Sequence, residues 1–292
     1  MIEHINAQSL ISSLDEVKLL IQERNIDVLC ITETWLLPHT PDHFINISDF
    51  NVFRCDNGRG AGACIYVRDT LKSNVLSLDI VRPPGIEDVW VTVQCRKLPS
   101  IVVGCMYRHP KALAVSYEYI EDVFRFLIVK KKTLFILGDF NDNIILKDSR
   151  LNRLIKNNKL AQIIDKPTRI TATSSTLLDL VITNKPKTIL THSTVPQIVA
   201  DHDLVSVQVN ISKPKRRPVI KTFRQLGKYS QETFFTLLVQ NSPAMNEMFL
   251  TDDVNDQVSI FNDVFTKTLN ACAPFVTKVI RRPPAPWMTD DI

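Results

Sequence analysis

The chain has 292 residues, of which 45% are hydrophobic and 23% are charged, with a formal net charge of +4. This balance excludes an intrinsically disordered protein, which needs low apolar content and high net charge. No apolar run approaches the ~20 residues that span a bilayer, and the N-terminus lacks a signal peptide's pattern, so we expect no membrane partner. Residues 1–212 hold 24 basic and 23 acidic side chains, so composition alone does not indicate an electrostatic nucleic-acid clamp.

Helix and strand patterns alternate along residues 1–212. Ser13 and Glu16 have the spacing of a capping box, which predicts a helix start. The glycine-rich stretch 58–62 lies between two strand-like runs and predicts a hairpin loop rather than a dinucleotide-binding turn. The apolar periodicity predicts helices over 14–21, 116–129 and 151–158, and strands over 26–31, 51–54, 64–67, 89–93, 101–106, 134–137, 177–182 and 204–209. Because strands often follow each other without a helix between them, we expect an α/β sandwich with mixed or antiparallel sheets.

A domain boundary is predicted near residue 212. The segment 212–218 contains prolines and four cations without an acid. The basic run 213–228 is interpreted as a solvated linker, with DNA-backbone contact or nuclear import left open. Two helical patterns follow, one starting at Ser230 and one over 254–265, and residues 281–287 are expected to form an extended linker.

Polar side chains follow several apolar strands at the point where each strand ends. Glu33, Tyr107 and Asp139 occupy such positions. The i, i+2 spacing of Asp139 and Asn141 places both on one face of an extended segment. Asp179 lies inside an apolar strand, where a carboxylate needs partners. Rigid strand ends are where ligand sites form in α/β proteins, so we expect these groups to converge.

These motifs occur in a characteristic order. The residues are Asn6 in INAQSL, Glu33 in ITETWL, Tyr107 in MYRHP, Asp139 and Asn141 in LGDFN, Asp179 in STLLDLVITN, and Asp201 and His202 in ADHDLV. Over about residues 3–210, the sequence resembles the endonuclease/exonuclease/phosphatase superfamily. Together with KPTR at 166–169, TETWL, YRHP and STLLDLVITN are most similar to the apurinic-type endonuclease domain of non-LTR (LINE-type) retrotransposons.

The resemblance implies a fold, a reaction and a cellular setting. The implied fold is a four-layered α/β sandwich, with two packed sheets flanked by helices, over residues 1–212. Residues 213–292 would form a basic linker and a helical extension leading toward an absent reverse transcriptase domain, so the chain reads as a truncated copy or an excised fragment. The implied reaction is Mg²⁺-dependent hydrolysis of a DNA phosphodiester, with Mn²⁺ as a possible substitute, leaving a 3′ hydroxyl that primes reverse transcription. The implied location is nuclear.

The resemblance also implies a metal site. Mg²⁺ prefers carboxylate oxygens. Glu33 is the first candidate ligand, with Asp201 or Asp139 as the second. The position two residues after Asn6 is acidic in related repair enzymes but is Gln8 here, which removes one ligand.

The remaining implied roles concern the substrate and the proton. His202 is the candidate base or electrostatic partner, and Asp179 would fix its tautomer. Asp139 would orient or deprotonate the attacking water. Phosphate oxygens would accept hydrogen bonds from Asn6, Asn141 and Tyr107, and flanking phosphates would contact Thr168 and Arg169.

Two other functions remain open, and several residues are expected to have no role in the site. The same fold could hydrolyse a small phosphoester, such as an inositol phosphate or a sphingolipid headgroup, or the chain could be a decayed, non-catalytic element. Trp35 and Trp90 are expected in the core. The histidines outside the motifs are expected at the surface, namely His4, His39, His43 and His192.

Overall fold

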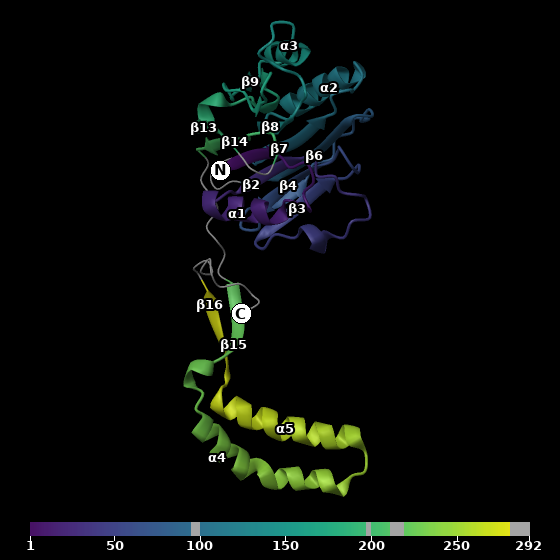
Figure 1. The fold of residues 1–292 in the computed structure, drawn as a ribbon. Coiled ribbons are helices and arrows are strands. Elements are labelled where there is room, and N and C mark those ends of the chain that lie inside the picture. Colours follow the sequence, from purple (N-terminus) through teal and green to yellow (C-terminus); the bar gives the residue numbers. More distant parts are fainter. Residues whose placement is uncertain (95–99, 197–199, 211–218, 281–292) are drawn as a thin grey trace. The chain divides into compact units, whose positions relative to one another are not determined.

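A computed structural model describes residues 1–94, 100–196, 200–210 and 219–280 (Figure 1). The chain divides into two compact units, Met1–Lys215 and Arg216–Ile292. The cations at 213–217 and the extended tail expected at 281–287 lie outside the described residues. No helix in the described ranges is long and apolar enough to cross a membrane.

Unit 1 contains two six-stranded sheets. The first has the strand order β13-β14-β1-β2-β4-β3, in which only β1 and β2 are parallel among the described pairs. Its strands are β1 (Ile2–Asn6), β2 (Val28–Thr32), β3 (Phe50–Cys55), β4 (Ala63–Arg68), β13 (Ile189–Val195) and β14 (Leu204–Val209). The glycine-rich stretch connects the antiparallel strands β3 and β4, which confirms the predicted hairpin.

The second sheet has the order β5-β6-β7-β8-β12-β9, with a parallel pair β7–β8. Its strands are β5 (Ser73–Val75), β6 (Ile86–Val93), β7 (Ile101–Arg108), β8 (Thr133–Asp139), β9 (Ala161–Gln162) and β12 (Asp179–Thr183). A short hairpin of β10 (Arg169–Ile170) and β11 (Ser175–Thr176) precedes β12. Leu177 and Leu178, expected in a strand, are buried in the connection between β11 and β12.

Helices cover the outer face of each sheet. Helix α1 (Leu14–Arg24) packs its apolar side on the first sheet, whereas α2 (Val115–Val129) and α3 (Arg150–Asn157) contribute side chains to the core that contains the second sheet. This arrangement confirms the predicted sandwich of two mixed sheets flanked by helices. The short 3-10 helices of this unit are η1 (Asp42–Ile45) and η2 (Pro186–Thr188).

Alternation along the strands of the first sheet divides the core. In β2, Cys30 joins the large core shared with the second sheet, whereas Leu29 and Ile31 join the smaller core beneath α1. In β4, Ile65 joins the large core and Tyr66 joins the smaller one. Because a strand's side chains alternate with period two, a strand covered on both faces reads as a continuous apolar run.

Ser13 does not form the predicted capping box. Its hydroxyl donates to the carbonyl of Ser9 at 2.7 Å and makes no side-chain cap bond to the helix. Trp90 is buried as expected, whereas Trp35 is only half-buried. The expectation that His4 lies at the surface is wrong, because its side chain is fully buried in β1.

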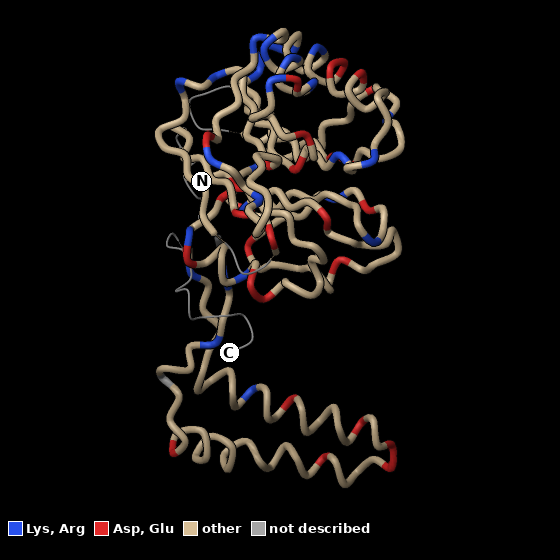
Figure 2. Tube along the Cα trace, turned by 45° about the horizontal axis from the view of Figure 1, so that its top comes forward, with Lys and Arg blue, Asp and Glu red and all other residues tan. Residues whose placement is uncertain are grey.

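Unit 2 contains a two-stranded ribbon and a helical hairpin. Its elements are β15 (Val219–Arg224), η3 (Leu226–Lys228), α4 (Gln231–Asn241), η4 (Ser242–Leu250), α5 (Val254–Cys272) and β16 (Phe275–Ile280). Residues 219–224 pair with β16, so this part of the basic run is a strand rather than a solvated linker. Few charges lie on the helical hairpin, and Lys267 is the only cation between 231 and 272 (Figure 2).

Candidate active site

The polar residues at the strand ends of unit 1 meet at one end of the sandwich. In the first sheet, β1 ends at Asn6, which is paired with Thr32 at the end of β2, and Glu33 follows directly. In the second sheet, Tyr107, Asp139 and Asp179 are partners across β7, β8 and β12. Partners in neighbouring strands point to the same face of a sheet.

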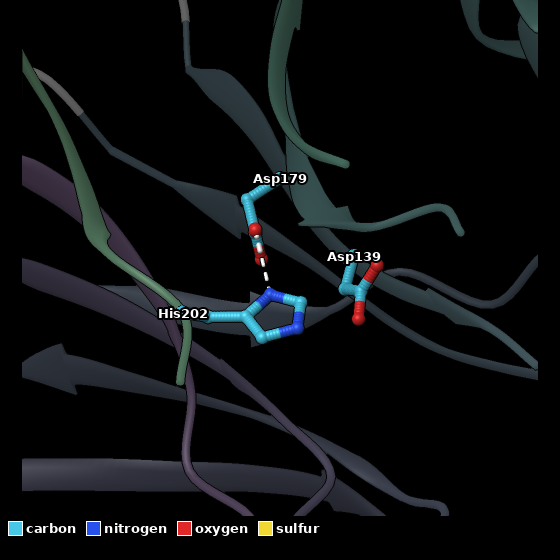
Figure 3. A group of neighbouring side chains, drawn as sticks. All are labelled: Asp139, Asp179 and His202. Carbon is cyan, nitrogen blue, oxygen red and sulfur yellow. Dashed lines mark hydrogen bonds and ion pairs between the residues drawn. The ribbon is translucent and has the colours of Figure 1, made fainter. Parts of the chain in front are cut away.

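The imidazole of His202 is joined to Asp179. His202 lies two residues before β14, and its Nδ1 is 2.8 Å from Oδ2 of Asp179 (Figure 3). Asp139 lies beside this pair, and the ligand atoms of the three side chains are all within 4.8 Å of one another. All three are buried. The pairing holds the ring in one orientation and leaves Nε2 as its free nitrogen.

Asn6 links the two sheets through its side-chain amide. Its Nδ2 donates to Oε1 of Glu33 at 2.8 Å and to Oδ2 of Asp139 at 3.0 Å. Both amide protons are therefore committed to carboxylates. Asn6 thus brings these two carboxylates together, although they belong to different sheets and lie far apart in the sequence.

Glu33 is held in an uncommon backbone conformation. Its φ is 51°, in the left-handed region that non-glycine residues rarely occupy. The backbone N–H of Ser9 donates to its carbonyl at 3.0 Å. The indole Nε1 of Trp35 donates to its Oε2 at 3.3 Å. The surrounding contacts therefore fix a half-buried carboxylate at the end of β2.

Tyr107 faces this carboxylate. Its hydroxyl hydrogen-bonds Glu33, and burial together with the negative charge of Glu33 raises its pKa. A neutral phenol is therefore retained throughout the physiological range. Its proton is therefore donated to the carboxylate of Glu33.

Asn141 lies just beyond the end of β8, so it is not on an extended segment with Asp139 as the spacing predicted. Its backbone N–H donates to Oδ1 of Asp139 at 3.0 Å, and its Nδ2 donates to the carbonyl of Arg108 at 3.0 Å. The residue is half-buried and has a φ of 46°. The second amide proton of Asn141 has no partner among the described residues and is free to donate to a ligand.

Asp201 is more exposed and has other partners. Arg169 forms an ion pair with its Oδ2 at 2.7 Å, and Gln8 donates to its Oδ1 at 2.7 Å. Its Oδ1 is 3.8 Å from Nε2 of His202. Burial raises the pKa of Asp201, but the hydrogen bond from Arg169 and the nearby charges lower it more. Asp201 therefore lies beside the free nitrogen of His202, outside the group of three buried side chains.

Thr168 lies inside the protein, where its side chain is not exposed to contact a flanking phosphate as predicted. It is fully buried, and its hydroxyl accepts from the backbone N–H groups of Leu178 and Asp179 at 3.2 and 3.1 Å. It therefore anchors the start of β12. Arg169, in contrast, is partly exposed beside His202, with which it forms a β-bridge.

Burial shapes the charge of the site. Burial and the neighbouring Asp179 raise the pKa of Asp139 to about 7. Burial lowers the pKa of His202, but the hydrogen bond and charge of Asp179 outweigh it and raise the pKa to about 9. The carboxylates of Glu33, Asp139 and Asp179 together bring more negative charge to the site than the imidazole of His202 can offset.

This donor set fits a divalent cation. Hard cations such as Mg²⁺ select carboxylate oxygens, and two carboxylates joined by one amide provide them at the edge of the sandwich. The raised pKa of Asp139 shows that its ionised form is disfavoured in the protein alone, and a nearby cation would offset that cost.

Sequence reasoning missed three polar residues of this region. Gln8 was noted only as an absent ligand, yet it hydrogen-bonds Asp201. Glu87 pairs with Tyr107 across β6 and β7, extending the row of polar side chains, and accepts from Asn57 at 2.7 Å. Alternation could have found His4, because it is two residues before Asn6 on the same face of β1.

The sequence matches the Endonuclease/Exonuclease/phosphatase family over residues 4–205. The chain therefore belongs to this family, whose name covers hydrolases of phosphoester bonds. No curated protein matches the sequence.

Solved structures share the fold at low sequence identity. One is the 3′ phosphatase NExo from Neisseria bound to a product DNA hairpin, with a TM-score of 0.59 and 14% identity over 71% of this chain and 98% of that one. Another is the endonuclease domain of TRAS1, a telomere-specific non-LTR retrotransposon, with a TM-score of 0.55 and 17% identity over 71% and 97%. An AP endonuclease from Archaeoglobus fulgidus has a TM-score of 0.53 and 16% identity over 72% and 98%.

Proposed function

We propose that the chain is a metal-dependent DNA endonuclease that hydrolyses a phosphodiester and leaves a 3′ hydroxyl, as in target-site nicking by a non-LTR retrotransposon. One observation carries this proposal. Asn6 joins the carboxylates of Glu33 and Asp139, while the Asp179–His202 pair lies directly beside Asp139. An oxygen-rich cation site thus adjoins an oriented imidazole, which is the combination that phosphodiester hydrolysis needs.

The proposed cofactor is Mg²⁺, with Mn²⁺ able to replace it. Glu33 would hold the ion, and Asp201 would join it once released from Arg169 and Gln8. Bound there, a divalent ion neutralises phosphate charge and stabilises the leaving oxygen.

The charges of His202 and Asp139 indicate different roles for the two side chains in the reaction. A pKa of about 9 makes His202 cationic at neutral pH, so it would stabilise a phosphate oxygen rather than take a proton. Asp139 is a buried carboxylate beside His202, and burial together with Asp179 raises its pKa, which favours a role as general base. We therefore assign the water's proton to Asp139 and the orientation of His202 to Asp179.

Two observations support DNA as the substrate. The motifs TETWL and STLLDLVITN resemble those of retrotransposon endonucleases, and the fold is similar to the TRAS1 endonuclease domain. Arg169 is partly exposed next to His202, where it would contact a flanking phosphate. Nuclear location and a reverse transcriptase domain as the partner of residues 213–292 belong to the same proposal.

The test is nicking of supercoiled plasmid. The parent should nick in Mg²⁺ and stop when EDTA is added. Glu33→Ala and His202→Ala should each lose a factor of ~10²–10⁴ in rate, because one removes a metal ligand and the other the cationic partner of the phosphate. His39→Ala, at an exposed loop position, is the matched control. Nicking that persists in both site variants would refute the assignment.

A second candidate activity is removal of a 3′ phosphate from DNA. The fold's similarity to NExo, a 3′ phosphatase, favours it. Release of inorganic phosphate from a 3′-phosphorylated hairpin, without nicking of plasmid, would identify this activity in place of the endonuclease.

A further inference from the structure

A second histidine contacts the carboxylate that orients His202. His4 lies in the middle of β1 and is fully buried. Its Nδ1 is 3.6 Å from Oδ1 of Asp179, while Oδ2 of the same carboxylate is 2.8 Å from His202. Two imidazoles therefore flank one carboxylate, one on each oxygen.

The two facing atoms lack other partners. Nδ1 of His4 and Oδ1 of Asp179 are both buried without a hydrogen bond among the described residues. A separation of 3.6 Å is just beyond hydrogen-bonding distance, so a small rotation of either side chain makes the bond. A buried carboxylate oxygen left unpaired is costly, which favours that rotation.

The other nitrogen of His4 faces a hydroxyl, so the ring proton can lie on either nitrogen. Nε2 is 3.0 Å from the hydroxyl of Thr32, which can either donate or accept. If the hydroxyl donates to Nε2, the proton of a neutral ring is on Nδ1 and faces Asp179. The opposite tautomer would direct a lone pair at the carboxylate. Burial lowers the pKa of His4 to about 4, which keeps the ring neutral.

We propose that His4 is a positioning residue, whose Nδ1–H holds Oδ1 of Asp179 so that Oδ2 stays on His202. The contact crosses from β1 in the first sheet to β12 in the second, as the contact between Asn6 and Asp139 does. Without it, only one oxygen of Asp179 is held, and the carboxylate is free to turn away from the imidazole. The functional consequence rests on the proposed hydrolytic role of His202.

The direct test reads the tautomer of His4 and needs no activity. Histidine is labelled with ¹⁵N in the full chain in EDTA at pH 7, and two-bond nitrogen–proton correlations report which nitrogen carries the proton. The His4 signals are assigned by their loss in His4→Asn. We expect a neutral ring protonated on Nδ1. Protonation on Nε2 would overturn the proposal, since the ring would then donate to Thr32 and offer Asp179 no proton.

A pair of substitutions tests the functional consequence. His4→Leu keeps much of the volume but removes the donor, whereas His4→Asn places an amide N–H near the original Nδ1. We expect His4→Leu to lower kcat for plasmid nicking roughly 10-fold or more with an unchanged KM, and His4→Asn to recover most of it. His39→Leu should match the parent.

The outcomes separate the two proposals. Equal losses of kcat in both variants would show a purely structural role for His4, and full activity in both would show no role; either result overturns the inference. If the parent does not cut DNA at all, the proposed function fails, while the tautomer measurement still decides whether His4 donates to Asp179.

Discussion

At the scale of single residues, the site is defined by carboxylates that the protein buries in contact with few cations. Asp139 and Asp179 are partners in adjacent strands, so their charges repel across a short distance in a poorly solvated region. His202 offsets part of this repulsion, and Asn6 donates to one of the carboxylates. The remaining negative charge is what makes a divalent ion a suitable occupant.

The shifted pKa of His202 predicts how stability depends on pH in the metal-free protein. Its folded-state pKa, about 9, lies above the ordinary histidine value of 6.5. The folded state therefore binds the His202 proton more tightly than the unfolded state does, and this difference stabilises the fold. The stabilisation is fully present below pH 6.5 and is lost as the pH rises through about 9. We expect the difference in unfolding free energy between the parent and His202→Gln to fall across this window by at most about 3 kcal/mol.

Urea unfolding in EDTA at several pH values measures this difference. His39→Gln serves as the control, because an exposed side chain should give a difference that does not change with pH. A parent–His202→Gln difference that stayed constant between pH 6.5 and 9 would show that the pairing with Asp179 does not raise the histidine pKa.

The sequence predicted which residues would approach one another but not all of their partners. Motif order and strand ends indicated Glu33, Asp139 and Asp179. Local patterns gave no sign that Asn6 donates to two carboxylates, because that contact depends on how two sheets pack. The burial of His4 was missed for a different reason: alternation places it on the same face as Asn6, but a polar residue in a short N-terminal segment looks exposed until strands flank it on both sides.

At the scale of elements, strand ends position the site because their registers agree. The row from Tyr107 through Asp139 to Asp179 depends on β7, β8 and β12 keeping their pairing. Gly138 directly precedes Asp139 in this row. A Cβ at Gly138 would lie 1.8 Å from the carbonyl oxygen of Met106 in β7, so only glycine allows the two strands this approach.

Gly138→Ala should therefore both destabilise the fold and disturb the site. We expect a loss of about 3 kcal/mol of unfolding free energy, since the clash is with backbone that cannot move aside. Nicking should fall as well, because Asp139 shifts with β8. Gly60→Ala is the control: it has a positive φ but no atom within 4 Å of an added Cβ, so it should cost only about 1 kcal/mol. Equal urea midpoints for the two variants would contradict this account.

Elements with strong periodicity were predictable, and their boundaries were less so. The strand 204–209 has the predicted bounds. The start of β12 differs because Leu177 and Leu178 are apolar but belong to a connection that Thr168 anchors by hydrogen bonds. Strand pairing of 219–224 depends on residues some fifty positions away, which no local pattern reveals.

At the scale of the whole molecule, the two units differ in how much they bury. Unit 1 holds both apolar clusters of the described residues. In unit 2, large apolar side chains remain exposed on the helical hairpin, including Phe235, Phe249, Val254 and Phe261. The proposed site lies entirely between Asn6 and His202. The sandwich and the proposed active site are therefore both contained in unit 1.

A chain that ends at residue 215 should therefore fold and act on its own. We expect its Tm to differ from that of the full chain by only about 2 °C, because the buried clusters are retained intact. Its Mg²⁺-dependent nicking rate should stay within about twofold, since every proposed site residue remains. Thermal melts and plasmid assays of the two chains, at equal concentration and salt, make the comparison. Loss of nicking with an unchanged Tm would show that residues 216–292 supply part of the DNA-binding surface.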